Sequence, residues 1–150
     1  MATRKIVLSD NIILRKVCKN VTEFDGALKQ LFSDMKETMH KNDGAGLAAP
    51  QVGVLKRAVI VEADGKYYEL VNPEIIYTAG NVNGVEGCLS IPGKYGYVAR
   101  PKTVTVRAQN SDGEVFQLAA SDMLARAVCH EIDHLNGVLF TDKMTKEAKK

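Results

Sequence analysis

Residues 129–137 read CHEIDHLNG, and their types and spacing are suited to binding a metal ion. His130 and His134 are four residues apart, so on a helix both imidazoles lie on one face and can reach one ion. Glu131 would then lie beside the metal, where its carboxylate can exchange a proton with a bound water. The alternative is a surface or core helix that merely carries these residue types. Because two of the three histidines in the chain have this spacing, we predict a metal site.

Two imidazoles require a third protein ligand. In one group of zinc peptidases it is the last histidine of H-E-x-x-H-x-x-G-x-x-H. Gly137 matches the glycine of that pattern, but Phe140 occupies the last position. In another group the ligand is a downstream glutamate, and here only Glu147 follows, in the lysine-rich segment TKEAKK. The third ligand is therefore expected upstream.

Cys88 is the best upstream candidate. It lies in NGVEGCLSIPGKYG (83–96), a glycine-rich strand or loop that can direct its sulfur towards a neighbouring helix. A buried apolar cysteine is the usual alternative. Cys18 lies in LRKVCKN, which we predict to be a strand, and Cys129 points about 100° away from His130 on a helix. One cysteine and two histidines with an open position are typical of a catalytic rather than a structural site.

The flanks of the motif predict the helix that the two histidines need. Ser121 or Asp122 can cap its start, and Asn136-Gly137 is a typical end. The residues between them are mostly good helix formers. An apolar stripe along this helix would face the core, and it consists of Leu124, Ala127, Val128 and Leu135.

A second, amphipathic helix is expected near the N-terminus, over residues 21–40. Thr22 with Asp25 resembles a capping box, and His40 lies at the opposite end. We expect His40 to be solvated at the helix end rather than to bind a metal. The apolar face, with spacings of three and four residues, consists of Phe24, Leu28, Leu31, Met35 and Met39.

The remaining segments indicate an α+β fold with largely antiparallel sheets. Residues 41–53, KNDGAGLAAPQVG, are rich in glycine and small residues, and their composition favours a plain loop. Two hairpins follow, over 57–73 and 102–120, each centred on an Asp-Gly pair between β-rich runs. Antiparallel sheets are thus expected to pack around a central metal-binding helix that carries HEIDH.

Length and composition restrict the possible function. The chain has 150 residues, 45% hydrophobic and 25% charged, as expected for a single globular domain over 1–150. A net charge of +2 and the absence of a basic block do not indicate a nucleic-acid surface. We see no signal peptide and no apolar run long enough to cross a membrane. Three widely spaced cysteines favour a reducing compartment, so we expect a cytoplasmic location.

Three motifs in this order resemble the peptide deformylase family: GAGLAAPQ at 44–51, EGCLS at 86–90 and HEIDH at 130–134. Weaker similarity extends from NIILRKVCKNV to FTDK, over nearly the whole chain. The resemblance implies that Cys88, His130 and His134 bind the metal. It also implies an enzyme that hydrolyses the formyl group of N-formyl-methionyl nascent peptides and releases formate.

Further roles follow from the same resemblance. Glu131 would take a proton from the attacking water and later protonate the leaving amine. The Gln51 side chain and the Leu89 backbone N–H would stabilise the oxyanion together with the metal. Gly46 would pair with the extended substrate. Glu86 and Arg100 match a pair of side chains in the family, which would support the loop that carries Cys88.

The resemblance implies Fe²⁺ as the metal, although Zn²⁺, Ni²⁺ or Co²⁺ suit the same ligands. The family's methionine pocket would include Ala45, which is smaller than the Ile or Val common there, together with Arg126 and Ala127. A transient contact with the ribosome is expected, and no long final helix, because the C-terminal tail is short. Two other functions fit part of the pattern: an HExxH metallopeptidase and a non-catalytic metal-binding or ribosome-associated module.

Overall fold

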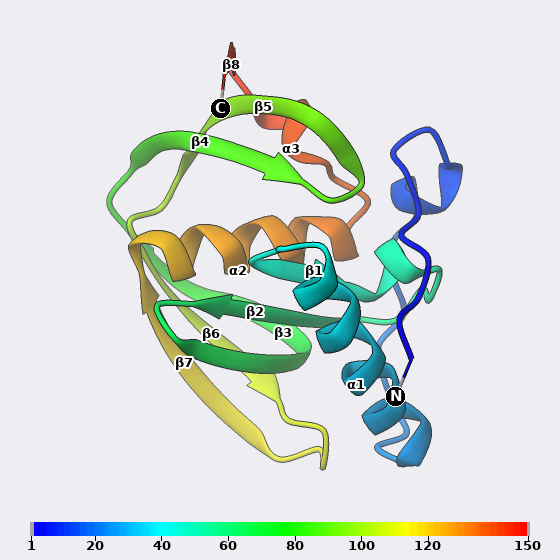
Figure 1. Cartoon of the computed structure of the whole chain (residues 1–150). Helices are drawn as coiled ribbons and strands as arrows, with labels where there is room; N and C mark the ends of the chain where they lie inside the picture. Colours follow the sequence, from blue (N-terminus) through cyan, green and yellow to red (C-terminus); the bar gives the residue numbers. More distant parts are fainter. Residues whose placement is uncertain (1, 150) are drawn as a thin grey trace.

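The computed structural model describes residues 2–149, in which two antiparallel sheets lie on either side of helix α2 (Asp122–Leu135) (Figure 1). The larger sheet has the strand order β1-β2-β3-β6-β7. Its strands are β1 (Gly46–Ala48), β2 (Ala58–Ala63), β3 (Lys66–Ala79), β6 (Thr103–Gln109) and β7 (Val115–Ser121). The prediction of an α+β fold with antiparallel sheets is confirmed.

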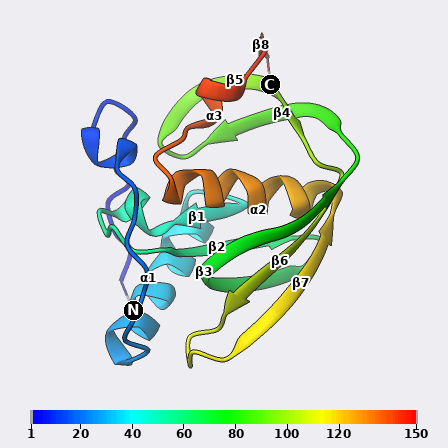
Figure 2. The same ribbon diagram turned by 180° about the vertical axis from the view of Figure 1, so that it is seen from behind.

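The smaller sheet covers the other side of α2 and has the order β4-β5-β8 (Figure 2). It consists of β4 (Val82–Cys88), β5 (Ile91–Arg100) and β8 (Lys146–Ala148). The β4–β5 hairpin is a third one beside the two predicted, and it was not predicted because the many glycines of this segment lower its β propensity. The pairing of β4 with β5 shifts register between Glu86 and Cys88, just before the turn.

Helix α1 spans Gly26–Lys41 and therefore begins five residues after the start of the predicted range. Asp25 is its N-cap, and its Oδ1 accepts the Leu28 N–H at 3.0 Å. The predicted capping role of Thr22 is wrong, because the chain enters the helix only at Gly26. His40 lies in the last turn, half-exposed, with its Nε2 2.9 Å from Glu62 Oε1.

The larger sheet is buried on both faces at β2, which explains the nearly continuous apolar run of this strand. Val59 and Val61 pack with the apolar side of α2 in one core cluster. Ala58 and Ile60, which alternate with them, pack with α1 in a second cluster. Alternate residues of a strand point to opposite faces, so β2 separates the two cores.

The segment 14–20, predicted as a strand, is mostly irregular. A 3₁₀ turn, η1, covers Ile12–Arg15, and the Asn11 side chain accepts the Ile13 N–H at its start. Cys18 is buried and donates its N–H to Leu135 O at 2.8 Å. The only strand-like feature among the described residues here is an isolated bridge of Lys19 with Lys56. Tertiary contacts with the end of α2 therefore replace a sheet ladder in this segment.

The segment 41–53, for which composition favoured a plain loop, is ordered into two elements. Gly46–Ala48 form β1, which pairs with β2, and Ala49–Val52 form the 3₁₀ helix η2. The expectation of a loop is wrong because Gly46–Ala48 gain a strand partner that local composition cannot show. The turn of the β2–β3 hairpin is at Asp64-Gly65, as predicted, with φ of 54° and 75°. The β6–β7 connection, around Gly113, is longer.

The end of the chain agrees with the expectation of no long final helix, since the last helix, α3, covers only Phe140–Lys143. None of the described helices combines the length and apolar character needed to cross a membrane. Helix α2 ends where predicted, with Asn136 as C-cap and Gly137 at φ 74°. The carbonyl of Leu135 accepts a hydrogen bond from Arg57 Nη1 at 3.0 Å.

We expect Gly137→Ala to destabilise the fold strongly, because a Cβ at this site would lie 2.5 Å from the carbonyl oxygen of Arg15. The left-handed conformation alone costs a residue with a side chain roughly 1–2 kcal/mol, and the backbone clash adds to that cost. The measurement is the free energy of unfolding in urea. Gly65→Ala is the matched control, since Gly65 has φ 75° and nothing within 4 Å of the added atom. Equal losses in the two variants would contradict the packing of the α2 terminus against Arg15.

Candidate metal centre

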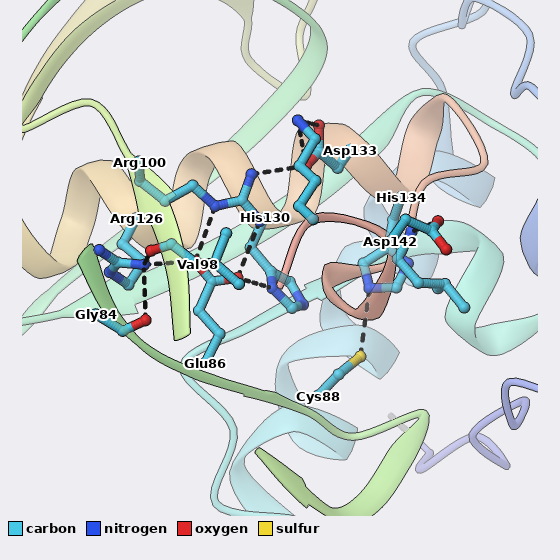
Figure 3. Close-up of polar contacts among 12 residues, drawn as sticks. Gly84, Glu86, Cys88, Val98, Arg100, Arg126, His130, Asp133, His134 and Asp142 are labelled. Carbon is cyan, nitrogen blue, oxygen red and sulfur yellow. Dashed lines mark hydrogen bonds and ion pairs between the residues drawn. The ribbon is translucent and has the colours of Figure 1, made fainter. Parts of the chain in front are cut away.

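Three side chains predicted as metal ligands meet between β4 and α2. Cys88 ends β4, and His130 and His134 lie on α2 (Figure 3). Their ligand atoms all lie within 4.8 Å of one another, and Cys88 Sγ is 3.4 Å from His134 Nε2. No other group of this kind occurs among residues 2–149. Cys18 and Cys129 are instead buried in the core.

Glu86 hydrogen-bonds to the first of the two predicted histidine ligands. Its Oε1 lies 2.9 Å from His130 Nδ1, which leaves the other ring nitrogen, Nε2, available for a metal. Arg100 binds both oxygens of the same carboxylate, with Nε at 2.8 Å and Nη2 at 2.9 Å. Glu86 and Cys88 are two residues apart on β4, so both side chains point towards α2 (Figure 3). The strand thus presents a predicted ligand, Cys88, and the hydrogen-bond partner of another, His130, on one face.

Arg126 is a second cation on this carboxylate. Its Nη1 donates to Glu86 Oε2 and to the carbonyl of Val98, both at 2.8 Å, and its Nη2 donates to the carbonyl of Val82 at 2.8 Å. The guanidinium passes directly over Gly84, where an added Cβ would lie 2.8 Å from Nη2. Arg126 therefore joins α2 to both long strands of the smaller sheet.

Asp133 was not anticipated from the sequence. It accepts a hydrogen bond from Arg100 Nη1 at 2.7 Å and forms an ion pair with Lys143 at 3.1 Å. The only feature of the nearby sequence that could have marked Asp133 as a site residue is its position on the helix, three residues after His130. Its main partner lies 33 residues earlier in the chain, so no sequence spacing marks the pair.

The charges of this network determine the ionisation of Glu86. Burial opposes the charged carboxylate, but hydrogen bonds from Arg100 and His130 outweigh it and lower the pKa of Glu86 to about 2. Burial also lowers the pKa of His134 to about 3, with the neighbouring charges of His130 and Arg100 acting in the same direction. His134 is therefore neutral, which is the form of imidazole that binds metals.

The environment of Glu131 shifts its pKa in the direction opposite to that of Glu86. Burial raises its pKa to about 7, and its Oε1 has no hydrogen-bond partner among the described residues. Gly46 lies against the carboxylate, so close that a Cβ there would be 2.6 Å from Oε2. A glycine at this position thus lets the backbone of β1 approach Glu131 directly.

Gln51 is held rigidly beside the centre and is 1% exposed. Its Oε1 accepts the Ala48 N–H at 2.9 Å. Its Nε2 lies 3.1 Å from Ser90 Oγ and 3.4 Å from Cys88 Sγ. The Gln51 amide group therefore faces the metal ligands. Ser90, which the sequence analysis did not single out, supports it.

A cleft of about 720 Å³ opens onto this centre. It runs between β1, at one edge of the larger sheet, and β4, at one edge of the smaller sheet. Of the twelve predicted site residues, only Arg100 and His134 are not at its surface. Those that line it are Ala45, Gly46, Gln51, Glu86, Cys88, Leu89, Arg126, Ala127, His130 and Glu131. Residues far apart in the sequence thus converge on one space.

The donors fit a single divalent metal ion. A cysteine sulfur and two imidazole nitrogens are a ligand set typical of catalytic sites with an open position. His134 Nδ1 is buried and has no hydrogen-bond partner among residues 2–149, so His134 is not committed to another structural role. Two of the three donor residues, Cys88 and His130, line the cleft together with Glu131.

The comparison with known proteins agrees with this arrangement. Residues 3–150 match the family model of polypeptide deformylase. The chain belongs to the peptide deformylase family. It is 55% identical over 146 residues to the peptide deformylase of Caldicellulosiruptor bescii, which covers 97% of this chain and 88% of that protein. It is also 51% identical to peptide deformylase 1 of Bacillus subtilis, with 97% and 92% covered.

Solved deformylases have the same fold. The crystal structure of peptide deformylase from Thermotoga maritima matches with a TM-score of 0.93 and 38% identity, over 95% of this chain and 98% of that one. The enzyme from Legionella pneumophila matches with a TM-score of 0.92 and 42% identity, over 95% and 86%. The mixed α/β architecture with antiparallel sheets is therefore that of the family.

We expect Glu86→Gln to weaken metal binding by about 10–100-fold, the usual effect of losing a partner that orients a histidine ligand. The free energy of unfolding should fall by about 3–5 kcal/mol, because Arg126 would lose its counter-ion and Arg100 would keep only Asp133. Chelator competition and urea unfolding measure the two effects.

Glu74→Gln is the matched control for this variant. Glu74 forms an exposed ion pair with Arg107 at 3.0 Å, so its loss should change stability by about 1 kcal/mol or less. Metal affinity should be unaffected. Unchanged metal affinity in Glu86→Gln would contradict the role of Glu86 in orienting His130.

Proposed function

We propose that this chain hydrolyses the N-terminal formyl group of formyl-methionyl polypeptides, in a single catalytic domain over residues 1–150. The observation that carries the proposal is the cysteine and two histidines beside a buried glutamate in an open cleft, in a chain of the peptide deformylase family. The substrates are nascent chains in the cytoplasm, which the enzyme would meet through transient contact with the ribosome.

Cys88, His130 and His134 would hold one divalent metal ion. Fe²⁺ is the proposed metal, and Zn²⁺, Ni²⁺ or Co²⁺ suit the same sulfur and nitrogen donors. When bound, the metal acts as a Lewis acid that activates water and polarises the formyl carbonyl.

The two open strand edges support binding of an extended peptide. An exposed edge offers unpaired backbone N–H and C=O groups, to which a peptide can add as a further strand. Gly46, at the start of the β1 edge, would pair with the substrate backbone beside Glu131. The methionine side chain would lie near Ala45, Ala127 and Arg126. The two alanines leave room, and the guanidinium of Arg126 is already bound to protein groups.

Glu131 is the proposed proton carrier. Its carboxylate takes a proton from the attacking water as the new C–O bond forms at the formyl carbon. It then gives this proton to the amine as the C–N bond breaks, which releases formate and a free N-terminus. A pKa of about 7 suits a group that must both accept and donate a proton near neutral pH.

Gln51 and Leu89 are the proposed donors to the oxyanion. The Gln51 Nε2 group faces the cysteine ligand at 3.4 Å, on the cleft side of the site. Leu89 directly follows the ligand, so its N–H lies in the turn beside it. Fixed donors of this kind stabilise charge that develops during the reaction.

A peptidase that cuts internal bonds is a weaker candidate. It would need a third ligand downstream of HEIDH, but Glu147 lies on β8 and is not part of the ligand group. A non-catalytic role is also disfavoured, since Glu131 lines the cleft beside the ligand group and no side chain among residues 2–149 binds its Oε1.

The deciding experiment is release of formate from a formyl-Met peptide, with the metal content of the same sample. We expect kcat/KM for formyl-Met to exceed that for the acetyl-Met version by far more than the uncatalysed rates differ. The methyl group of acetyl would displace the carbonyl, and a misplacement of about 1 Å can cost 10²-fold. Comparable corrected values would instead indicate a broad amidase.

Glu131→Ala should retain metal and fold but lose roughly 10²–10⁴-fold in kcat, the usual contribution of general acid–base catalysis. Single-turnover formate release measures the loss, and metal analysis checks occupancy. A rate within a few-fold of the unmodified enzyme would mean that another group carries the proton.

Cys88→Ala should lose metal and activity together, because two imidazoles leave the ion under-coordinated. Metal content after dialysis measures the effect. Cys18→Ala is the control, since Cys18 is a buried core residue away from the ligands and its removal should leave metal content unchanged. Full metal content in Cys88→Ala would exclude Cys88 as a ligand.

A further inference from the structure

The amide group of Gln51 has its orientation fixed by the protein. The Ala48 N–H can only donate, so the atom 2.9 Å from it must be the amide oxygen. The nitrogen therefore faces Ser90 and Cys88. Because Gln51 is 1% exposed, its two amide hydrogens have to be satisfied inside the protein.

Ser90 determines where the second amide hydrogen points. Its hydroxyl oxygen, 3.1 Å from Nε2, accepts one of the two hydrogens. The planar NH₂ group then directs its other hydrogen towards Cys88 Sγ and the cleft. The terminal torsion of glutamine is broad, so without Ser90 the amide could turn away from the reacting centre. Ser90 is 0% exposed, so no bulk water could replace it.

The N-terminal strap, residues 2–11, holds both partners of this hydrogen bond. The Val7 N–H donates to the backbone oxygen of Gln51 at 2.8 Å, and the Ser9 N–H donates to that of Ser90 at 2.9 Å. Figures 1 and 2 show the strap, in blue, running along α1, past η2 and on towards the β4–β5 turn. It thus links two segments that belong to different parts of the fold.

The strap is itself anchored on α1. The Arg4 N–H donates to Thr38 Oγ1 at 2.8 Å, and Arg4 Nε donates to Asp34 Oδ2 at 2.9 Å. Among residues 2–149, no strand of the larger sheet pairs with a strand of the smaller one. The backbone bonds of the strap therefore connect η2, which follows β1, to the turn Leu89-Ser90, which follows Cys88.

We propose that Ser90 is a positioning residue for deformylation, which aims the Gln51 amide at the reacting carbonyl, and that the N-terminal strap fixes the distance between the two. The inference rests on the proposed function, because it assigns a purpose to Gln51 in that reaction. Ser90 acts through Gln51 and does not touch the substrate.

A double-mutant cycle tests whether Ser90 acts through Gln51. Gln51→Ala should lower kcat by about 10²–10³-fold, as for other oxyanion donors. Ser90→Ala should lower kcat by roughly 10-fold, with KM and metal content little changed. If Ser90 acts through Gln51, adding Ser90→Ala to Gln51→Ala should have almost no further effect, because coupled residues are not additive. Multiplied losses would overturn the proposal. Ser33→Ala, at a half-buried serine of α1, is the control.

A second measurement does not depend on activity. In the Zn²⁺-loaded protein, the side-chain amide of Gln51 should give two separated NMR proton signals that exchange slowly with water. In Ser90→Ala these signals should move towards those of a free glutamine. Unchanged signals would overturn the positioning role. If the unmodified protein releases no formate, the proposed function fails. The NMR comparison would still decide whether Ser90 holds the Gln51 amide.

The strap is tested by proline at position 9. Ser9→Pro removes the N–H that binds Ser90, whereas Ser9→Ala retains it. We expect a several-fold lower kcat and shifted Gln51 amide signals for Ser9→Pro only. Leu8→Pro controls for a proline within the strap, since the Leu8 N–H makes no hydrogen bond among the described residues. Equal behaviour of the Ser9→Pro and Ser9→Ala variants would show that the strap does not position this part of the site.

Discussion

The buried carboxylate of Glu86 is the interaction on which the rest of the site depends. It accepts four hydrogen bonds, two from Arg100 and one each from Arg126 and His130. All of its lone-pair positions are thus occupied by charged or chargeable donors from β5 and α2. Removing ions from water is costly, and only such complete pairing makes a buried charge tolerable.

This network also explains how the smaller sheet is attached to the protein. Neither apolar core cluster contains a fully buried residue of β4, β5 or β8. The buried side chains of β4 and β5 are instead Glu86, Val98 and Arg100. Apolar packing tolerates small shifts, whereas charged hydrogen bonds have defined directions. A sheet held by such bonds can place Cys88 accurately opposite two histidines of α2.

Local patterns predicted the parts of the structure that depend on neighbouring residues. The spacing of His130 and His134 and the Asn136-Gly137 stop located α2, because helix geometry and capping are local properties. Asp64-Gly65 located a turn for the same reason. The pairing of Arg100 with Asp133, in contrast, joins residues distant in sequence, and no local signal encodes it.

The two wrong segment predictions have a related cause. Segment 14–20 was predicted as a strand, yet its buried Cys18 bonds to the end of α2 instead of to a sheet. Segment 41–53 has residues typical of loops, yet Gly46–Ala48 form a strand, because they pair with β2. In both places tertiary contacts outweigh intrinsic propensity.

The polar atoms around the centre differ in how fully they are satisfied. Glu86 and Gln51 have every strong donor or acceptor paired, so their positions are fixed before any substrate arrives. Glu131 Oε1 and His134 Nδ1 are buried without partners among residues 2–149. The paired groups thus hold the geometry of the site, while the Glu131 oxygen that no described side chain occupies is available for the proton transfer proposed for it.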